Sequence, residues 1–87
     1  MVRARKEIHM AYQEMYESLV QRLDEEPKEA VRRIRAAAGM SQGQFHTAYG
    51  VPRRTLQDWE AGRRIPPAYV VELLARAVAQ DLTSPSA

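Results

Sequence analysis

Residues 40–62 contain the start and stop signals of two short helices placed close together, and this feature constrains the fold of the chain more than any other. Gly50 can adopt the positive φ that ends a helix, and Pro52 suits the first turn of the next helix because its missing N–H would have no partner there. Leu56 and Trp59 then lie three residues apart on one face of this second helix, which we expect to point inward. Its other face carries Arg53, Arg54, Gln57 and Asp58. The segment therefore predicts two short helices joined by a tight turn, the second with an apolar and a polar side.

The first of these two helices has a start signal of its own. Ser41 and Gln44 fit the S-x-x-Q capping box, in which each side chain pairs with a backbone N–H of the other residue. Met40 and Phe45 are placed to close beside it as a hydrophobic staple. We therefore expect this helix to begin at about Gln42 and to end before Gly50.

The spacing of apolar residues predicts three further helices. The five expected helices span about residues 5–24, 27–38, 42–49, 52–61 and 67–80. No segment shows the sustained alternation of a strand, so the predicted fold is all-α, a five-helix bundle. Its expected core residues are Val31, Ile34, Phe45, Val51, Leu56, Trp59, Val70, Leu73 and Leu74.

The length of 87 residues fits one compact domain with additions at both ends. We expect an amphipathic N-terminal helix in residues 1–26, the domain that holds the two short helices in residues 27–80, and a disordered tail in residues 81–87. The chain has no cysteine, which excludes disulfides and thiolate metal sites. No apolar run approaches the roughly 20 residues needed to cross a bilayer, and the N-terminus is too charged for a secretory signal. We therefore expect a soluble, cytoplasmic protein.

The net charge of +2 is unevenly distributed along the chain. Residues 28–64 hold eight Lys and Arg against three Asp and Glu, whereas the segments on either side of them are both net negative. Lys and Arg that gather on one face displace the counterions condensed on a polyphosphate. The middle segment is therefore the part of the chain best suited to bind phosphates.

No arrangement of residues points to an enzyme active site. The two histidines, His9 and His46, lie 37 positions apart without cysteine or suitably spaced carboxylates, which makes a poor metal site. No Ser-His-Asp arrangement, phosphate-binding glycine loop or catalytic pair of carboxylates can be argued. We expect no catalysis, no cofactor and no metal.

The residues from about 30 to 78 resemble the lambda-repressor-like, or Xre-type, helix-turn-helix family. The resemblance is carried by Ile34-Arg35, Gly39-Met40-Ser41-Gln42, Phe45, Gly50-Val51, and Thr55-Leu56-x-x-Trp59-Glu60-x-Gly62 followed by basic residues and Pro66. It implies a sequence-specific regulator of transcription that binds double-stranded DNA, acting as a dimeric repressor on an inverted repeat.

The same resemblance implies roles for individual residues. The positions that read base edges in the family match Arg53, Arg54 and Gln57. The positions that contact DNA phosphates match Gln42, Gln44, Thr55, Arg63 and Arg64. Arg35 and Glu60 match two positions that form a structural ion pair. His46 departs from the family, which usually has a small residue there, and we expect its side chain to swing outward rather than to separate the two short helices.

Two functional alternatives remain open. The chain could be the antitoxin of a toxin–antitoxin pair, which binds a protein toxin and regulates its own promoter through the same domain, or a co-activator bridge with little specific DNA affinity. The apolar stripe of the N-terminal helix is compatible with packing on the domain, with a dimer contact and with docking of another protein.

Overall fold

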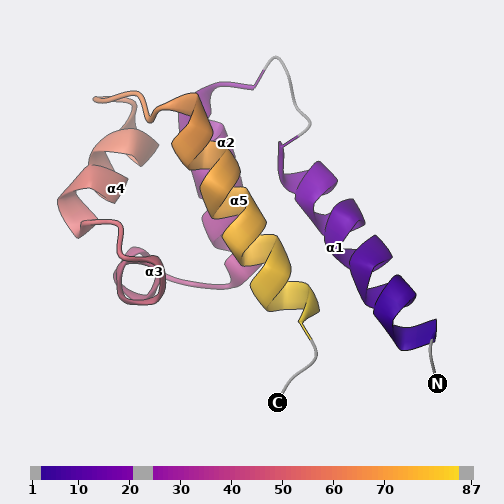
Figure 1. The fold of residues 1–87 in the computed structure, drawn as a ribbon. Coiled ribbons are helices and arrows are strands. Elements are labelled where there is room, and N and C mark those ends of the chain that lie inside the picture. The colour runs from indigo at the N-terminus through magenta and orange to yellow at the C-terminus, as the bar shows by residue number, and fades with distance from the viewer. Residues whose placement is uncertain (1–2, 21–24, 85–87) are drawn as a thin grey trace.

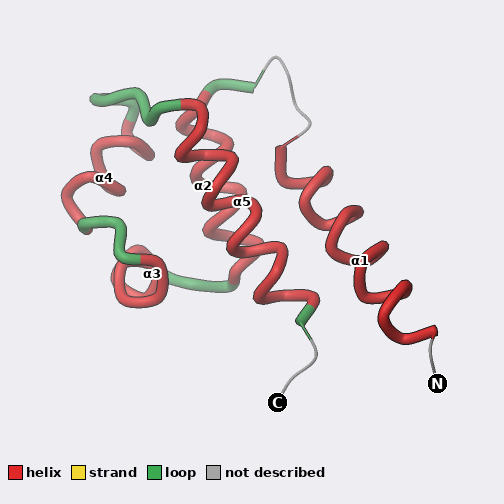
Figure 2. Tube along the Cα trace, in the orientation of Figure 1, coloured by secondary structure: helices red, strands yellow, loops and turns green. Residues whose placement is uncertain are grey.

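The computed structural model describes residues 3–20 and 25–84, apart from the side chains of residues 3–10. These residues form helices α1 (Arg3–Val20), α2 (Pro27–Ala38), α3 (Gln42–Tyr49), α4 (Arg53–Ala61) and α5 (Ala68–Thr83), and no strand (Figures 1 and 2). The prediction of an all-α fold with five helices is confirmed. The expected end of the first helix at residues 21–24, the side chain of His9, and the tail residues 85–87 lie outside the described residues.

Local signals set most helix ends. Gly39 and Gly50 adopt φ of 71° and 78° and end α2 and α3. Pro52 and Pro67 were expected to be the first residues of their helices. Each instead lies immediately before its helix, Pro52 before α4 and Pro67 before α5. Their carbonyl oxygens nevertheless accept hydrogen bonds from the first turn of each helix.

Helix α5 extends beyond its predicted end and includes residues 81–83, which we expected to belong to the tail. Tyr49 at the end of α3 donates a hydrogen bond of 2.7 Å to the Asp81 carboxylate. The Thr83 hydroxyl donates to the Ala79 carbonyl at 2.7 Å. These contacts hold the last turn of α5 in place, and the first of them joins residues 32 positions apart.

Helix α1 lies alongside α5, on the opposite side of α5 from α3 and α4 (Figure 1). Leu19 is buried, and its neighbours on the same stripe pack against the core: Tyr12, Met15, Tyr16 and Val20. Arg33 of α2 donates hydrogen bonds to the Glu25 carboxylate and to the Leu19 carbonyl. The C-terminal end of α1 is thereby fastened to α2, and its apolar stripe is used within the molecule.

Six of the nine expected core residues are buried: Val31, Ile34, Phe45, Val51, Leu56 and Leu74. Trp59 and Val70 are partly buried and pack against this cluster. The prediction for Leu73 is wrong, because its side chain is 56% exposed. Helix α5 instead turns Ala75, Val78 and Ala79 inward, and Leu73 lies about 200° around the helix from Ala75. None of the described helices is long and apolar enough to cross a membrane.

Candidate nucleic-acid interface

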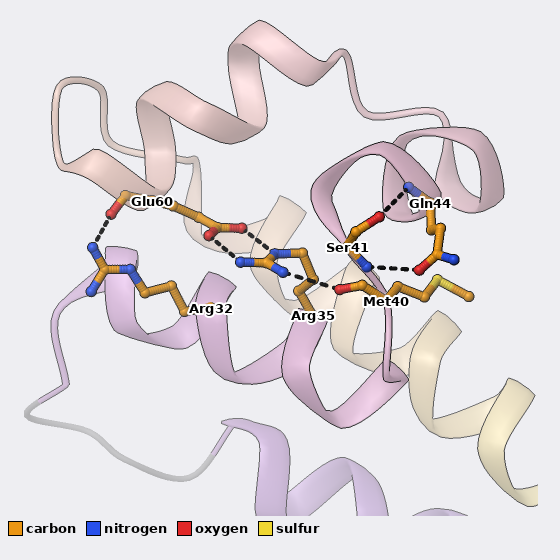
Figure 3. A network of polar contacts seen from close by, with 6 residues as sticks. All are labelled: Arg32, Arg35, Met40, Ser41, Gln44 and Glu60. Atoms are coloured by element: carbon orange, nitrogen blue, oxygen red, sulfur yellow. Dashed lines mark hydrogen bonds and ion pairs between the residues drawn. The ribbon is translucent and has the colours of Figure 1, made fainter.

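Helices α3 and α4 form a helix-turn-helix unit whose start is capped as the sequence predicts. The Gln44 backbone N–H donates to the Ser41 hydroxyl at 3.1 Å, and the Ser41 N–H donates to the Gln44 side-chain oxygen at 2.9 Å (Figure 3). The Gly50 N–H donates to the His46 carbonyl at 2.8 Å, which closes the end of α3. Both ends of α3 are therefore held by hydrogen bonds, and the chain enters α4 through a short, ordered turn.

The C-terminal end of α4 is fixed to α2 by two arginines. Arg35 donates two hydrogen bonds of 2.7 Å to the Glu60 carboxylate, one from Nε and one from Nη2. Arg35 also donates to the Met40 carbonyl at 3.0 Å, and Arg32 donates to the Glu60 carbonyl at 2.6 Å (Figure 3). A planar guanidinium suits this bidentate geometry, which restricts both side chains. The structure thus pairs Arg35 with Glu60, as the family resemblance implied.

This ion pair shifts both groups toward their charged forms. Burial alone would raise the pKa of Glu60, but the hydrogen bonds and charge of Arg35 outweigh it and lower that pKa below its ordinary value of 4.5, with smaller contributions from Gln42 and Arg32. The hydrogen bonds to Glu60 in turn raise the pKa of Arg35, and partial burial offsets only part of this. The pair is therefore a charged brace at neutral pH.

The three candidate base-reading side chains are exposed on α4: Arg53, Arg54 and Gln57. The Arg53 guanidinium lies against Gly43 of α3, where its Cζ would be 3.7 Å from an added Cβ. An added Cβ at Gly43 would therefore make only ordinary van der Waals contact with this side chain. The side chain of Thr55 is partly buried on the same helix.

Asp58 is the residue of α4 whose surroundings sequence reasoning did not predict. We expected it on the exposed polar face of α4, but its side chain is only 11% exposed. Arg63 Nη1 donates to Oδ1 at 3.2 Å, while the Nε atoms of Arg54 and Arg64 lie 3.6 and 3.7 Å from Oδ1 and Oδ2. The loop after α4 folds over this carboxylate, because the N–H groups of Arg63 and Arg64 both donate to the Asp58 carbonyl. The i, i+4 spacing of Arg54 and Asp58 was the one available signal.

The candidate phosphate contacts lie at both ends of the unit. Gln42 and Gln44 stand in the first turn of α3, where backbone N–H groups lack helical partners. Gln42 is half-buried toward Glu60, and the oxygen of Gln44 is occupied by the capping box. Arg63 and Arg64 are exposed in the loop after α4, beside Asp58.

His46 is exposed, with its Nδ1 2.8 Å from the Val51 carbonyl oxygen, as expected for a ring turned outward. The side chain is held against the turn by this contact. The large residue at this position therefore does not enter the core.

Part of the positive charge of residues 28–64 is engaged in contacts within the molecule. Of the arginines of α2, Arg32 and Arg35 pair with α4, and Arg33 pairs with Glu25. Within the described residues, the arginines presented on the outer side of the unit come from α4 and its following loop: Arg53, Arg54, Arg63 and Arg64. The basic surface on this unit is accordingly smaller than the charge count suggests.

Comparison with known proteins places this unit in a family. A family model described as helix-turn-helix matches residues 31–83, which is more than half of the chain. Searches of curated proteins and of solved structures found no match. The match begins in α2 and ends with α5, and it covers the capped α3, the Gly50 turn and α4. The chain therefore belongs to the helix-turn-helix family of the lambda-repressor or Xre type, a family of DNA-binding transcriptional regulators rather than of enzymes.

Proposed function

We propose that this protein is a sequence-specific regulator that places α4 in the major groove of double-stranded DNA and represses transcription as a homodimer. The observation that carries this proposal is the position of Arg53, Arg54 and Gln57, which are exposed on a helix braced at its far end by Arg35 and Glu60. A recognition helix needs this combination, because its base-reading side chains must reach the bases from a fixed backbone.

The chemistry of the exposed residues suits base reading. An arginine fork can bond both O6 and N7 of guanine, and each such pair discriminates against other bases by about 1–3 kcal/mol. Gln42, Gln44, Thr55, Arg63 and Arg64 flank these readers, at the start of α3, on α4 and after it. We propose that they contact phosphates and set the register of α4 on the duplex.

The test is selection of duplexes from a random pool, followed by measurement of binding at several salt concentrations. Arg53→Ala and Arg54→Ala should each lower the preference for the selected duplex over a random one. Arg63→Ala should instead weaken binding to both duplexes alike and make the salt dependence shallower by about one counterion. A wild-type chain without preference for any duplex would refute the proposal.

The dimer in this proposal is supported by an exposed apolar patch. Tyr69 and Leu73 are 67% and 56% exposed and lie one turn apart on α5, and Ile65, which is 78% exposed, lies in the loop before that helix. Ile65 lies in the loop that follows α4, so a contact between two copies through this patch would join them close to their recognition helices. A dimer on an inverted repeat needs those helices about 34 Å apart. Sedimentation of the wild type and of Leu73→Glu tests this, with loss of the dimer expected in the variant. Dimeric masses for both proteins would place the dimer contact elsewhere, and monomeric masses for both would contradict the proposed dimer.

The packing of α1 favours this regulator over the antitoxin alternative. The stripe that an antitoxin would offer to a toxin is occupied by the protein's own core through Leu19 and its neighbours. Co-purification from the native cell would separate the two, since a stoichiometric partner bound through α1 would support the antitoxin.

A further inference from the structure

One buried carboxylate lies within the proposed DNA-binding surface. Asp58 is surrounded by the guanidinium groups of Arg54, Arg63 and Arg64, at 3.2–3.7 Å, and these side chains are 67–85% exposed while Asp58 is 11% exposed. The three arginines come from two segments, the first turn of α4 and the loop that follows it. Asp58 is therefore the point where the candidate base-reading and phosphate-binding residues meet.

A negative charge at this place opposes DNA binding in general. It reduces the attraction of three arginines for phosphates, and it repels the phosphates themselves. Ion pairs with exposed arginines contribute little to folding stability, so stability alone is a weak reason for such an arrangement. The arrangement must therefore be judged by what it does to binding.

The geometry around Arg54 indicates what the carboxylate provides. The Arg54 atom that lies 3.6 Å from Asp58 Oδ1 is Nε, which is not one of the two terminal nitrogens of the guanidinium. Those terminal nitrogens form the fork that can bond O6 and N7 of guanine. An ion pair through Nε would restrict the Arg54 side chain while leaving this fork unengaged, so that less conformational freedom would be lost on binding.

We propose that Asp58 is a specificity-determining positioning residue: it orients Arg54 for base reading and weakens attraction to phosphates of any sequence. This inference rests on the proposed function. The two effects are separable, since the first favours the selected duplex, whereas the second weakens binding to selected and random duplexes alike. Asp58 does this through the arginines and without touching a base.

The experiment compares four full-length proteins: wild type, Asp58→Asn, Arg54→Ala and the double variant. Each is titrated with the duplex selected by the wild type and with a random duplex of equal length, from about 50 to 200 mM salt. Asp58→Asn keeps the size of the side chain and removes its charge. It should raise affinity for random DNA several-fold, steepen the salt dependence by about one counterion, and lower the ratio of specific to random affinity by about fivefold or more.

The double variant distinguishes positioning from a general charge effect. In the Arg54→Ala background, Asp58→Asn should still raise random binding but leave the specificity ratio unchanged. Glu14→Gln is the matched control, because it removes one negative charge from the exposed face of α1, away from α4, and should leave the ratio as it is. An Asp58→Asn protein with the wild-type ratio would overturn the inference while leaving the proposed function intact. Absence of any preference in the wild type would instead refute the proposed function.

A second measurement uses only the wild-type protein, so it does not depend on whether a variant folds. In the free wild-type protein, ¹⁵N relaxation of the Arg54 Nε–H group should give an order parameter above about 0.6, the limit for flexible groups. A lower value would show that Asp58 does not orient Arg54, and would overturn the inference even if Asp58→Asn were too unstable to assay.

Discussion

Single charged side chains divide into those that hold the fold and those that face outward. Glu60 and Glu29 illustrate the difference, since both pair with an arginine of α2. The Glu60 side chain is 7% exposed and accepts two hydrogen bonds, whereas Glu29 and its partner Arg32 are each about half exposed. Removing one member of a buried pair leaves an unmatched charge, which is much more destabilising than losing a surface pair.

Glu60→Gln should therefore destabilise the protein by about 2–3 kcal/mol, because Arg35 keeps its charge without a carboxylate partner. Glu29→Gln, the matched control, should change stability by less than about 1 kcal/mol. Urea denaturation of the two variants and the wild type measures both effects. Equal losses in the two variants would contradict the role of Glu60 as a brace.

The same carboxylate predicts how stability depends on pH. The pKa of Glu60 is lower in the folded than in the unfolded chain, so its stabilising effect is complete above about its ordinary value of 4.5 and is lost as the pH falls through the lower folded value. The stability difference between wild type and Glu60→Gln should consequently shrink in acid. Urea denaturation of both proteins from about pH 6.5 to pH 3 tests this, and a difference independent of pH would count against it.

Among the elements, α3 contains one glycine and is ended by another, and we expect substitutions at the two positions to have opposite effects. Gly50 ends the helix at φ 78°, whereas Gly43 lies within the helix at an ordinary φ. An added Cβ would meet nothing within 4 Å at Gly50, and would only make ordinary contact with Arg53 at Gly43. Backbone conformation rather than space therefore distinguishes the two positions.

Gly50→Ala should destabilise the protein by about 1–2 kcal/mol, because a left-handed conformation is unfavourable for residues with a Cβ. Gly43→Ala should stabilise it by about 0.5 kcal/mol, since alanine loses less entropy than glycine when the helix forms. Thermal denaturation followed by circular dichroism compares the two. A stabilising effect of Gly50→Ala would mean that the turn between α3 and α4 differs from the one described.

At the scale of the whole molecule, α1 is part of the folded domain. It contributes Leu19 to the core and is tied to α2 through Arg33, although the family match begins only at residue 31. Its packing along α5 places it away from α3 and α4 (Figure 1). Its contribution should therefore be to stability rather than to contact with DNA.

Leu19→Ala should accordingly lower the free energy of unfolding by about 2–4 kcal/mol through lost burial and the cavity left behind. Glu14→Ala, on the exposed side of the same helix, should have an effect within about 0.5 kcal/mol. Urea denaturation followed by circular dichroism should show one transition in all three proteins. An unchanged midpoint in Leu19→Ala would show that α1 does not pack on the domain in solution.

The features that the sequence by itself determined are those that depend on neighbouring residues. Ser41 with Gln44 marks the start of α3, and Gly39 and Gly50 mark helix ends. The apolar residues Ile34, Phe45 and Leu56 identify the inward faces of α2, α3 and α4. These signals act within one or two helical turns, where backbone hydrogen bonds and side-chain periodicity leave few alternatives.

Only the tertiary structure decided which residues meet across elements. The exposure of Leu73 and the burial of Ala75 depend on where α1 and α2 pack on α5, and the last turn of α5 depends on the contact between Tyr49 and Asp81. The charge pattern marked residues 28–64 as basic, but it could not show that Arg33 faces Glu25 or that Asp58 gathers three arginines. The partner of a charged side chain is set by distance in space, which the order of residues along the chain does not contain.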